Sequence, residues 1–334
     1  MEIRYPDYYK RFVCLAGACP DSCCHEWEVD VDPGAADYYR HLPGELGDRI
    51  REVLVPGEDG WASMKLTEDR RCPMWRDDGL CRIQAELGHD DLCDTCRNFP
   101  RLTHDYGDFV ELGLELSCPE AARILLSNPH SKWITEEVPG GEPPEYEAQY
   151  MKVLQISRDK AVELALDETV SVGEAIASVL VYAHIVYYAT DMRELVEFDL
   201  EHHLEKFRNQ KRDVFLEEFW DPYRNLEILT DRWKVLLERG PADAPWKAEH
   251  RALMRYFIDR YWLHSAYDDD FATRAIFMAL SCLVIRSMGG NTVEMAQLYS
   301  KEIENDADNV EELYEFIRNS SPEYLTKLLI ILLK

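Results

Sequence analysis

The chain has 334 residues, and its acidic side chains outnumber the basic ones by 64 to 37, which gives a formal net charge of −27 at pH 7. A surface of this sign repels phosphate backbones and anionic lipids, so DNA, RNA and anionic membranes are poor partners. It suits a basic partner such as a lysine-bearing protein, although an acidic excess also simply keeps a protein soluble. With 46% hydrophobic residues the chain can bury a sizeable core in one large domain or two smaller ones.

The opening residues, MEIRYPDYYKRF, are too polar for the apolar segment of a signal peptide. The longest apolar stretches, at residues 275–285 and 328–333, are shorter than the roughly 20 residues that a membrane span requires. We therefore expect a cytoplasmic protein that does not enter a membrane.

Cysteine is concentrated in the first third of the chain, where nine of the ten cysteines precede residue 119: Cys14, Cys19, Cys23, Cys24, Cys72, Cys81, Cys93, Cys96 and Cys118. Cys282 lies in an apolar run and is expected to be a small core residue. Disulfides are typical of small secreted domains and are disfavoured in a reducing cytosol. Ligation of a metal or cluster explains both the density of the cysteines and their short spacings.

The identity of the metal is left open by the spacings. Thiolate-rich sites select zinc, copper(I) or iron–sulfur clusters. The intervals Cys14-x4-Cys19-x3-Cys23-Cys24 and Cys93-x2-Cys96 match neither a zinc finger nor a ferredoxin. A radical-type cluster would need Cys-x3-Cys-x2-Cys, and Cys19 and Cys23 supply only the first interval because position 26 is Glu26. His25 is either a nitrogen ligand or a surface residue.

Local patterns place several of these cysteines on defined elements. Asp32 precedes a predicted helix over residues 33–42, and the turn signal at 77–79 predicts a hairpin that brings Cys72 near Cys81. A second hairpin is expected over 101–116, followed by a helix over 119–126. Ser117 and Glu120 are spaced as a capping box for that helix, which would put Cys118 at the helix N-terminus, where the dipole favours a thiolate.

Helical periodicity dominates the remainder of the chain. Residues 128–147 are rich in Pro, Gly and Glu and read as a linker, and Ser171-x-x-Glu174 is a capping box before the apolar stretch 176–188. Another capping box, Ser320-x-x-Glu323, precedes the last helix. Further helices are expected at about 197–218, 222–239, 244–264, 270–288, 291–303, 308–319 and 321–333.

The predicted fold class follows from these elements. It is mainly α, with a bundle-like helical domain at 148–334, a linker at 128–147, and a small irregular α+β cysteine-rich domain at 1–127 that binds a metal or cluster. Strands and helices do not alternate, and no glycine-rich phosphate-binding motif occurs, so a parallel nucleotide-binding sheet is not expected.

The segments around the cysteines resemble the flagellin lysine-N-methylase family, which belongs to a wider group with a CxxCxxCC-type zinc- or iron-chelating domain. The resemblance is carried by FVCLAGAC at 12–19, DSCCHEW at 21–27, DGLCRI at 78–83, CRNFPR at 96–101 and LSCPEAAR at 116–123. Fainter matches occur at RYFIDR, 255–260, and KEIE, 301–304. The likeness therefore extends over nearly the whole chain.

The wider group is described by eight cysteines, and matching them here implies the ligands Cys14, Cys19, Cys23, Cys24, Cys72, Cys81, Cys96 and Cys118. Cys93 is the additional cysteine and the first candidate for a non-ligand. The opening spacings are x4 and x3 rather than x2 and x2. The resemblance further implies methyl transfer from S-adenosylmethionine to lysine side chains of a flagellin-like protein, with a 4Fe-4S cluster as the expected centre and zinc or iron as alternatives.

Methyl transfer requires a neutral amine, because lysine has a pKa near 10.4 and its ammonium form cannot attack. A carboxylate or tyrosine near the amine is needed, and the candidates are Tyr256, Asp259, Tyr261, Glu302, Glu304 and Asp306. Each could equally be a solvated helix residue or a core aromatic, so no catalytic or donor-binding residue is assigned. The alternatives are a non-catalytic metal-binding or redox module with a helical partner-binding domain, and a radical enzyme in which the donor binds the cluster.

Overall fold

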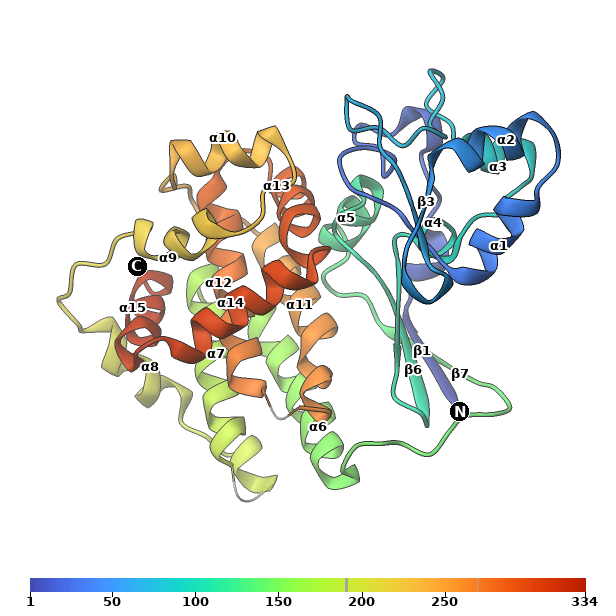
Figure 1. Cartoon of the computed structure of the whole chain (residues 1–334). Helices are drawn as coiled ribbons and strands as arrows, with labels where there is room; N and C mark the ends of the chain where they lie inside the picture. Colours follow the sequence, from blue (N-terminus) through green and yellow to red (C-terminus); the bar gives the residue numbers. More distant parts are fainter. Residues whose placement is uncertain (190–191, 269) are drawn as a thin grey trace. The chain divides into compact units, whose positions relative to one another are not determined.

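The computed structural model describes residues 1–189, 192–268 and 270–334, and its secondary structure is mainly α-helical, as predicted (Figure 1). The chain forms two compact units. The helical unit comprises Met1–Lys10, Thr103–Ser117 and Ala122–Lys334, and the cysteine unit comprises Arg11–Leu102 and Cys118–Ala121. The predicted domain boundary at residue 127 does not coincide with these units, because strands near the N-terminus and in the predicted linker pair within the helical unit.

A four-stranded sheet belongs mostly to the helical unit. Its strands are β1 (Glu2–Pro6), β5 (Arg101–Asp105), β6 (Phe109–Leu114) and β7 (Trp133–Glu137), in the order β5-β6-β1-β7. β1 runs parallel to β6, with Ile3 opposite Val110, and antiparallel to β7, with Arg4 opposite Thr135. The predicted hairpin over 101–116 is confirmed, and Gly107 turns it with φ +88. The predicted linker, however, contains strand β7.

The helices of the helical unit follow the sheet in the chain, and α5 (Pro119–Leu126) begins in the cysteine unit. The others are α6 (Ala148–Ala165), α7 (Val172–Tyr188), α8 (Leu200–Arg208), α9 (Glu217–Trp220), α10 (Asp231–Arg239), α11 (Glu249–Tyr261), α12 (Phe271–Met288), α13 (Thr292–Tyr299), α14 (Ala307–Asn319) and α15 (Pro322–Leu332). Short 3-10 turns lie at Met192–Leu195, Asp221–Asn225 and Trp262–Ala266, and a π-helix at Ser300–Glu304 continues α13.

The core of the helical unit lies around α7, α11 and α12, which are buried over most of their lengths. Helix α12 is long and apolar enough to cross a membrane by length and composition, but 83% of its apolar window is buried inside the unit. Core helices of globular proteins pass the same test. Cys282, on this helix, is fully buried as predicted.

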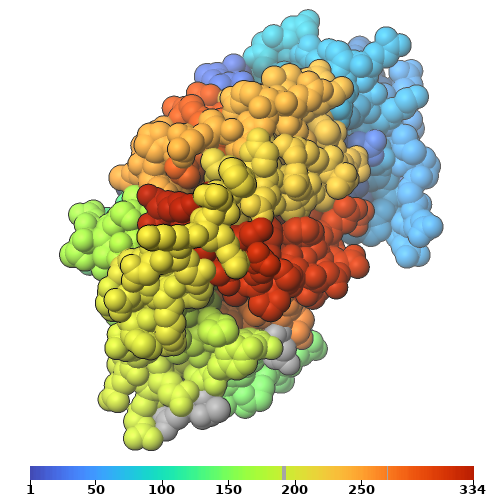
Figure 2. All heavy atoms as spheres, turned by 90° about the vertical axis from the view of Figure 1, so that its left-hand side faces the viewer, coloured from blue at the N-terminus to red at the C-terminus, as the bar shows by residue number. Residues whose placement is uncertain are grey.

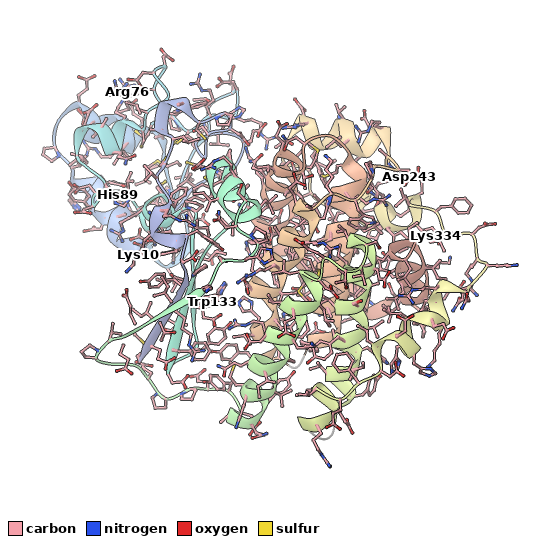
Figure 3. The ribbon with its side chains drawn as sticks, turned by 180° about the vertical axis from the view of Figure 1, so that it is seen from behind. Lys10, Arg76, His89, Trp133, Asp243 and Lys334 are labelled. Atoms are coloured by element: carbon pink, nitrogen blue, oxygen red, sulfur yellow. The ribbon has the colours of Figure 1, made fainter. Side chains whose placement is uncertain are left out.

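A buried ion pair connects α6 to the sheet. Both guanidinium nitrogens of Arg158 donate to the carboxylate of Glu111 on β6, at 2.7 and 2.9 Å. The guanidinium carbon also lies 5.2 Å from the ring centroid of Trp133 on β7, which Figure 3 labels. Because truncating one partner of a buried pair leaves the other charge uncompensated, this contact fixes the helix on the sheet.

Three helix predictions for the helical unit are wrong, and one of its helices was not predicted. The helix expected over 222–239 begins only at Asp231, after a 3-10 turn at Asp221–Asn225. The continuous helix expected over 197–218 ends at Arg208, and the polar residues after it run along the unit as irregular chain. Ion pairs from Arg212 to Glu323 and from Lys327 to Glu218 attach this segment to α15, and Figure 2 shows it (yellow) lying against α14 and α15 (red). Helix α15 starts at Pro322 after Ser321, one residue later than the predicted cap. Helix α6 was not predicted.

The cysteine unit has short elements around a small core. Helices α1 (Pro33–His41), α2 (Gly44–Val53), α3 (Arg82–Glu86) and α4 (Asp94–Asn98) accompany strands β2 (Asp30–Val31), β3 (Leu54–Pro56) and β4 (Ala62–Met64) in the order β2-β4-β3. Val31, Ala36, Tyr39 and Ile50 are fully buried. The Tyr39 hydroxyl donates to the carbonyl of Asp91 at 2.7 Å and so holds the loop that leads into α4.

Candidate metal centre

The first four cysteines lie on a loop that packs backbone to backbone on the hairpin preceding α3. A Cβ added to Gly17 would lie 2.7 Å from the carbonyl oxygen of Asp78, and one added to Gly79 would lie 2.8 Å from Cα of Gly17. Gly79 also has φ +78, which favours glycine. These two glycines therefore permit the approach that places the loop of Cys14 and Cys19 beside the hairpin that ends at Cys81.

Cys72 and Cys81 flank the predicted turn. The backbone bridge between Trp75 and Cys81, with Arg76 N–H donating to the Leu80 carbonyl, confirms a hairpin at this position. The N–H of Cys72 donates to the carbonyl of Cys24 at 2.8 Å, and the thiols of these two residues are hydrogen-bonded to each other. The hairpin thus carries one cysteine against the Cys23-Cys24 pair and the other to the start of α3.

Cys93 and Cys96 lie one helical turn apart at the start of α4. Asp32 fixes this end of the helix, because its Oδ1 accepts the N–H of Ala35 in α1 and its Oδ2 accepts the N–H of Asp94, both at 2.9 Å. The thiols of Cys93 and Cys96 share a hydrogen bond. Cys93, the first candidate for a non-ligand, thus contacts the expected ligand Cys96. Its side chain is buried, with 3% of the residue exposed.

Cys118 occupies the N-terminus of α5, as predicted, but the cap differs. Its sulfur accepts the N–H groups of Glu120 and Ala121, so Cys118 takes the place predicted for Ser117. Burial of the thiol raises its pKa to about 11 despite those two hydrogen bonds. Cys14 and Cys19 are close enough for negative charge on either to raise it further.

These segments surround one cavity of about 350 Å³ within the cysteine unit. The cysteines that line it are Cys14, Cys19, Cys23, Cys24, Cys81, Cys96 and Cys118. Cys72 and Cys93 do not line the cavity, and the thiol of each is hydrogen-bonded to the thiol of a lining cysteine. The volume is at the lower end of the range for small-molecule and cofactor sites, so a compact inorganic group fits it.

The thiols compete for protons in this arrangement. Hydrogen bonding to Cys23 raises the pKa of Cys24, and hydrogen bonding to Cys24 raises that of Cys72. In the second pair, Cys93 has a lowered pKa because Cys96 donates to it, and Cys96 a strongly raised one. Several thiolates in this space would need a compensating positive charge, which a bound cation would supply. The donor set therefore fits a thiolate-ligated metal or cluster.

All ten cysteines lie among the described residues, and all are free thiols. The structure therefore contains no disulfide among the described residues. Seven cysteines share the lining with apolar residues such as Phe12, Leu80 and Phe99, and a soft, thiolate-bound centre suits such a lining. Seven of the eight expected ligands line the cavity, whereas Cys72, the eighth, and Cys93 do not.

Comparison with known proteins gives three relatives at the same level of identity. The lysine-N-methylases of Salmonella typhimurium and Salmonella choleraesuis are 31% identical over 137 residues, which is 40% of this chain and 34% of each of those proteins. The flagellar biosynthetic protein FliU of Salmonella muenchen is 31% identical over 137 residues, which cover 81% of FliU. The chain belongs to the lysine-N-methylase family.

The match spans about a third of the length of the two curated lysine-N-methylases. No family model matches the chain, and no solved structure does. Membership of the lysine-N-methylase family therefore rests on the sequence relatives.

All the acid–base candidates for a lysine-N-methylase lie in the helical unit, and two of them bind backbone N–H groups at helix starts. Glu302 accepts the N–H groups of Leu229 and Thr230, both at 2.8 Å, ahead of α10. Asp306 accepts those of Asp308 and Asn309 at 3.0 Å as the N-cap of α14. Such bonds satisfy exposed backbone donors at helix starts. Both carboxylates therefore have structural roles.

Tyr256, Tyr261 and Glu304 converge in the interior of the helical unit. The Glu304 carboxylate accepts both hydroxyls, at 3.1 and 2.8 Å, and lies 3.4 Å from the guanidinium of Arg260, whose other carboxylate neighbour is Glu115 at 3.9 Å. The faint sequence match at 255–260 and 301–304 thus marks residues that meet in space. Arg260 and Glu115 were not predicted, since only the fold brings the end of β6 to this place.

Asp259 is held apart from that network by its own ion pair. Its carboxylate lies 3.2 Å from Nε of Arg255, and desolvation by burial raises its pKa. The guanidinium of Arg255 also donates to the carbonyl of Pro129 at 2.6 Å. The geometry therefore gives Asp259 a structural contact.

Proposed function

We propose that this protein is an S-adenosylmethionine-dependent protein lysine N-methyltransferase with a 4Fe-4S cluster in its cysteine unit. The observation that carries the proposal is that seven cysteines line one cavity, with two more hydrogen-bonded to lining cysteines, in a chain whose relatives include proteins named lysine-N-methylase. Zinc or iron ions are the alternative occupants, because the same thiolates would bind them.

The cluster ligands are proposed among the cysteines that line the cavity. Four thiolates hold a four-iron cluster, so nine cysteines exceed the requirement of one cluster. Cys72 and Cys93, whose thiols are hydrogen-bonded to those of lining cysteines, would then hydrogen-bond to ligand sulfurs and so tune the centre. When bound, a cluster supplies either one-electron chemistry or cohesion to a unit with a small core.

Methyl transfer itself would balance as a displacement. The lone pair of a neutral lysine Nζ forms a bond to the methyl carbon while the carbon–sulfur bond of the sulfonium breaks, and S-adenosylhomocysteine leaves. The amine proton passes to a base or to water. The protein must hold donor and amine in line, because near-attack alignment provides much of the rate.

The substrate is proposed to be a flagellin-like protein with surface lysines, and the site of action the cytoplasm. The flagellar name of the Salmonella muenchen relative supports the first part. The net charge of −27 supports it also, since a lysine-bearing surface is attracted to an acidic protein.

The centre is tested on protein purified without oxygen. A brown sample with broad visible absorption, and iron and acid-labile sulfide in equal amounts, supports the cluster. A colourless, zinc-loaded sample contradicts it. Cys96→Ser should lose the bound iron, whereas Cys282→Ser, at a buried position in the helical unit, should retain it.

The reaction is tested by incubating the protein with methyl-labelled S-adenosylmethionine and flagellin and locating label on lysine by mass spectrometry. Donor binding by calorimetry without transfer to any lysine-rich protein contradicts the enzyme proposal. Absence of both supports the alternative, a non-catalytic metal-binding or redox module. Under reducing conditions, release of 5′-deoxyadenosine would identify a radical route.

A further inference from the structure

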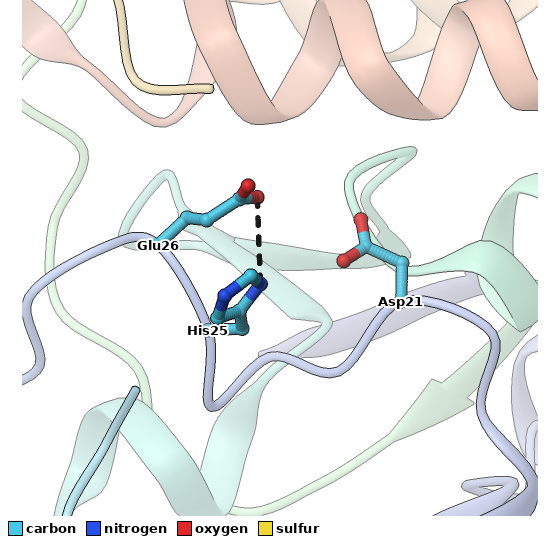
Figure 4. A group of neighbouring side chains, drawn as sticks. All are labelled: Asp21, His25 and Glu26. Carbon is cyan, nitrogen blue, oxygen red and sulfur yellow. Dashed lines mark ion pairs between the residues drawn. The ribbon is translucent and has the colours of Figure 1, made fainter. Parts of the chain in front are cut away.

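Three oxygen- and nitrogen-bearing side chains meet on the loop that carries Cys19, Cys23 and Cys24. They are Asp21, His25 and Glu26, and one ligand atom from each lies within 4.8 Å of the other two. Nδ1 of His25 is 3.8 Å from Oε2 of Glu26. All three are half-buried, and Figure 4 shows their side chains turned toward one another.

The backbone holds these residues in place. Glu26 has φ +81, a left-handed conformation that a non-glycine residue adopts only when its surroundings impose it. Its N–H donates to the carbonyl of Arg70 at 2.8 Å, and the Arg70 guanidinium donates to the carbonyl of Glu26 at 2.9 Å. His25 forms a backbone bridge to Arg71. This turn therefore directs the Glu26 carboxylate toward the His25 imidazole.

We infer that Asp21, His25 and Glu26 bind one divalent cation, at a site separate from the thiolates. Ligand atoms around a metal with bonds of about 2.1 Å lie about 3.0–3.4 Å apart. Separations within 4.8 Å therefore close by side-chain rotation of roughly an ångström. Two carboxylates and a neutral imidazole carry a charge of −2, which a dication neutralises.

The donor atoms narrow the choice of divalent cation. Carboxylate oxygen and imidazole nitrogen suit manganese, ferrous iron and zinc, whereas thiolates hold softer centres. Asp21 also lines the cysteine cavity, so the ion would lie at the rim of that cavity. Three protein ligands leave coordination positions for water or a small ligand. This inference goes beyond the proposed methylase activity and does not depend on it.

Manganese is the probe, because thiolates compete poorly for it and it has an electron paramagnetic resonance signal. Titration of the protein purified without oxygen, its cysteine centre in place, should show one bound Mn²⁺ per chain. Pulsed spectra of that complex should show ¹⁴N coupling from the His25 imidazole. Stoichiometric binding without nitrogen coupling, or weak binding of many ions to the acidic surface, overturns the inference.

Variants locate the site. Asp21→Asn, His25→Gln and Glu26→Gln should each weaken Mn²⁺ binding at least tenfold while retaining the metal content of the cysteine centre. His41→Gln is the matched control, because His41 pairs with Asp37 at 3.5 Å in the same unit, and the described residues offer no third donor there. His41→Gln should bind as the parent does. Unchanged affinity in the three site variants would overturn the assignment even if nitrogen coupling is seen.

Discussion

Glu304 combines full burial with several donors on one carboxylate. Its side chain has no exposed surface, and Tyr256, Tyr261 and Arg260 all converge on it. Removing the carboxylate would leave the buried Arg260 guanidinium with Glu115, at 3.9 Å, as its nearest carboxylate. The cost of breaking such a pair exceeds its net contribution, because the remaining charge stays desolvated.

We expect Glu304→Ala to lower the free energy of unfolding by about 3–5 kcal/mol. Denaturant unfolding followed by circular dichroism measures it. Glu311→Ala on α14 is the control, since its ion pair with Arg318 lies at the surface and should change stability by less than about 1 kcal/mol. Equal effects of the two substitutions would contradict this account of the network.

The histidine pair of β5 and the turn after α11 predicts acid sensitivity. Nε2 of His264 and Nδ1 of His104 are 2.8 Å apart and share one N–H. Burial lowers the pKa of His104 to about 4 and of His264 to about 3, from 6.5. Between pH 6.5 and 4 the unfolded chain thus binds protons that the folded chain does not, so stability should fall as pH falls.

For His104 this loss approaches about 3 kcal/mol at pH 4. Unfolding free energies measured from pH 4 to 7 should show it, and a double variant with His104→Gln and His264→Gln should flatten the slope. The exposed His130, changed to Gln, serves as control. A double variant with the slope of the parent would mean that other groups cause the acid sensitivity.

Among elements, the contact between α7 and α15 depends on a single glycine. A Cβ on Gly173, in the first turn of α7, would lie 2.1 Å from the carbonyl oxygen of Leu332 and 2.8 Å from Nε1 of Trp246. Helix propensity alone favours alanine over glycine by about 1 kcal/mol. The contact with Leu332 opposes this gain. Because a backbone carbonyl cannot rotate away as a side chain can, the clash should make the net effect on stability unfavourable.

Gly173→Ala should therefore destabilise the helical unit by about 1–3 kcal/mol. Thermal or denaturant unfolding tests the sign. Lys152→Ala on the neighbouring helix α6, at an exposed position, should be nearly neutral. A stabilised Gly173→Ala variant would show that α15 moves aside without cost.

Whether an element could be predicted depended on how local its signal was. Asp32 and Ser171 cap helices as expected, because a side chain and an N–H three residues later suffice. Strand β7 was read as part of a linker, since β1, its partner, is more than 120 residues away in the chain. The chain that follows α8 also depends on distant residues, since Arg212 and Glu218 pair with charged residues of α15.

At the scale of the whole molecule, the cysteine unit should depend on the proposed metal or cluster centre more than the helical unit does. The buried core of the cysteine unit is small and its elements are short. Metal binding then contributes directly to folding. The helical unit has long buried helices and needs no such support.

Removing the metal or cluster with a chelator, after oxidation where iron is present, should increase amide hydrogen exchange throughout Arg11–Leu102 and leave α7, α11 and α12 protected. Exchange followed by mass spectrometry resolves the two regions. The parent protein with its centre intact is the reference. Equal loosening of both units, or of neither, would contradict the separate stability of the two units.

The sequence by itself determined that the protein is mainly helical, that its cysteines concentrate in one region, and that it resembles lysine-N-methylases. These features follow from composition, residue spacing and local periodicity. Only the tertiary structure decided which thiols share a cavity, that Cys93 bonds to Cys96, and that Glu304 meets Tyr256 and Arg260. The reason is physical: hydrogen bonds and burial between segments far apart in the chain depend on the folded path, which no local pattern encodes.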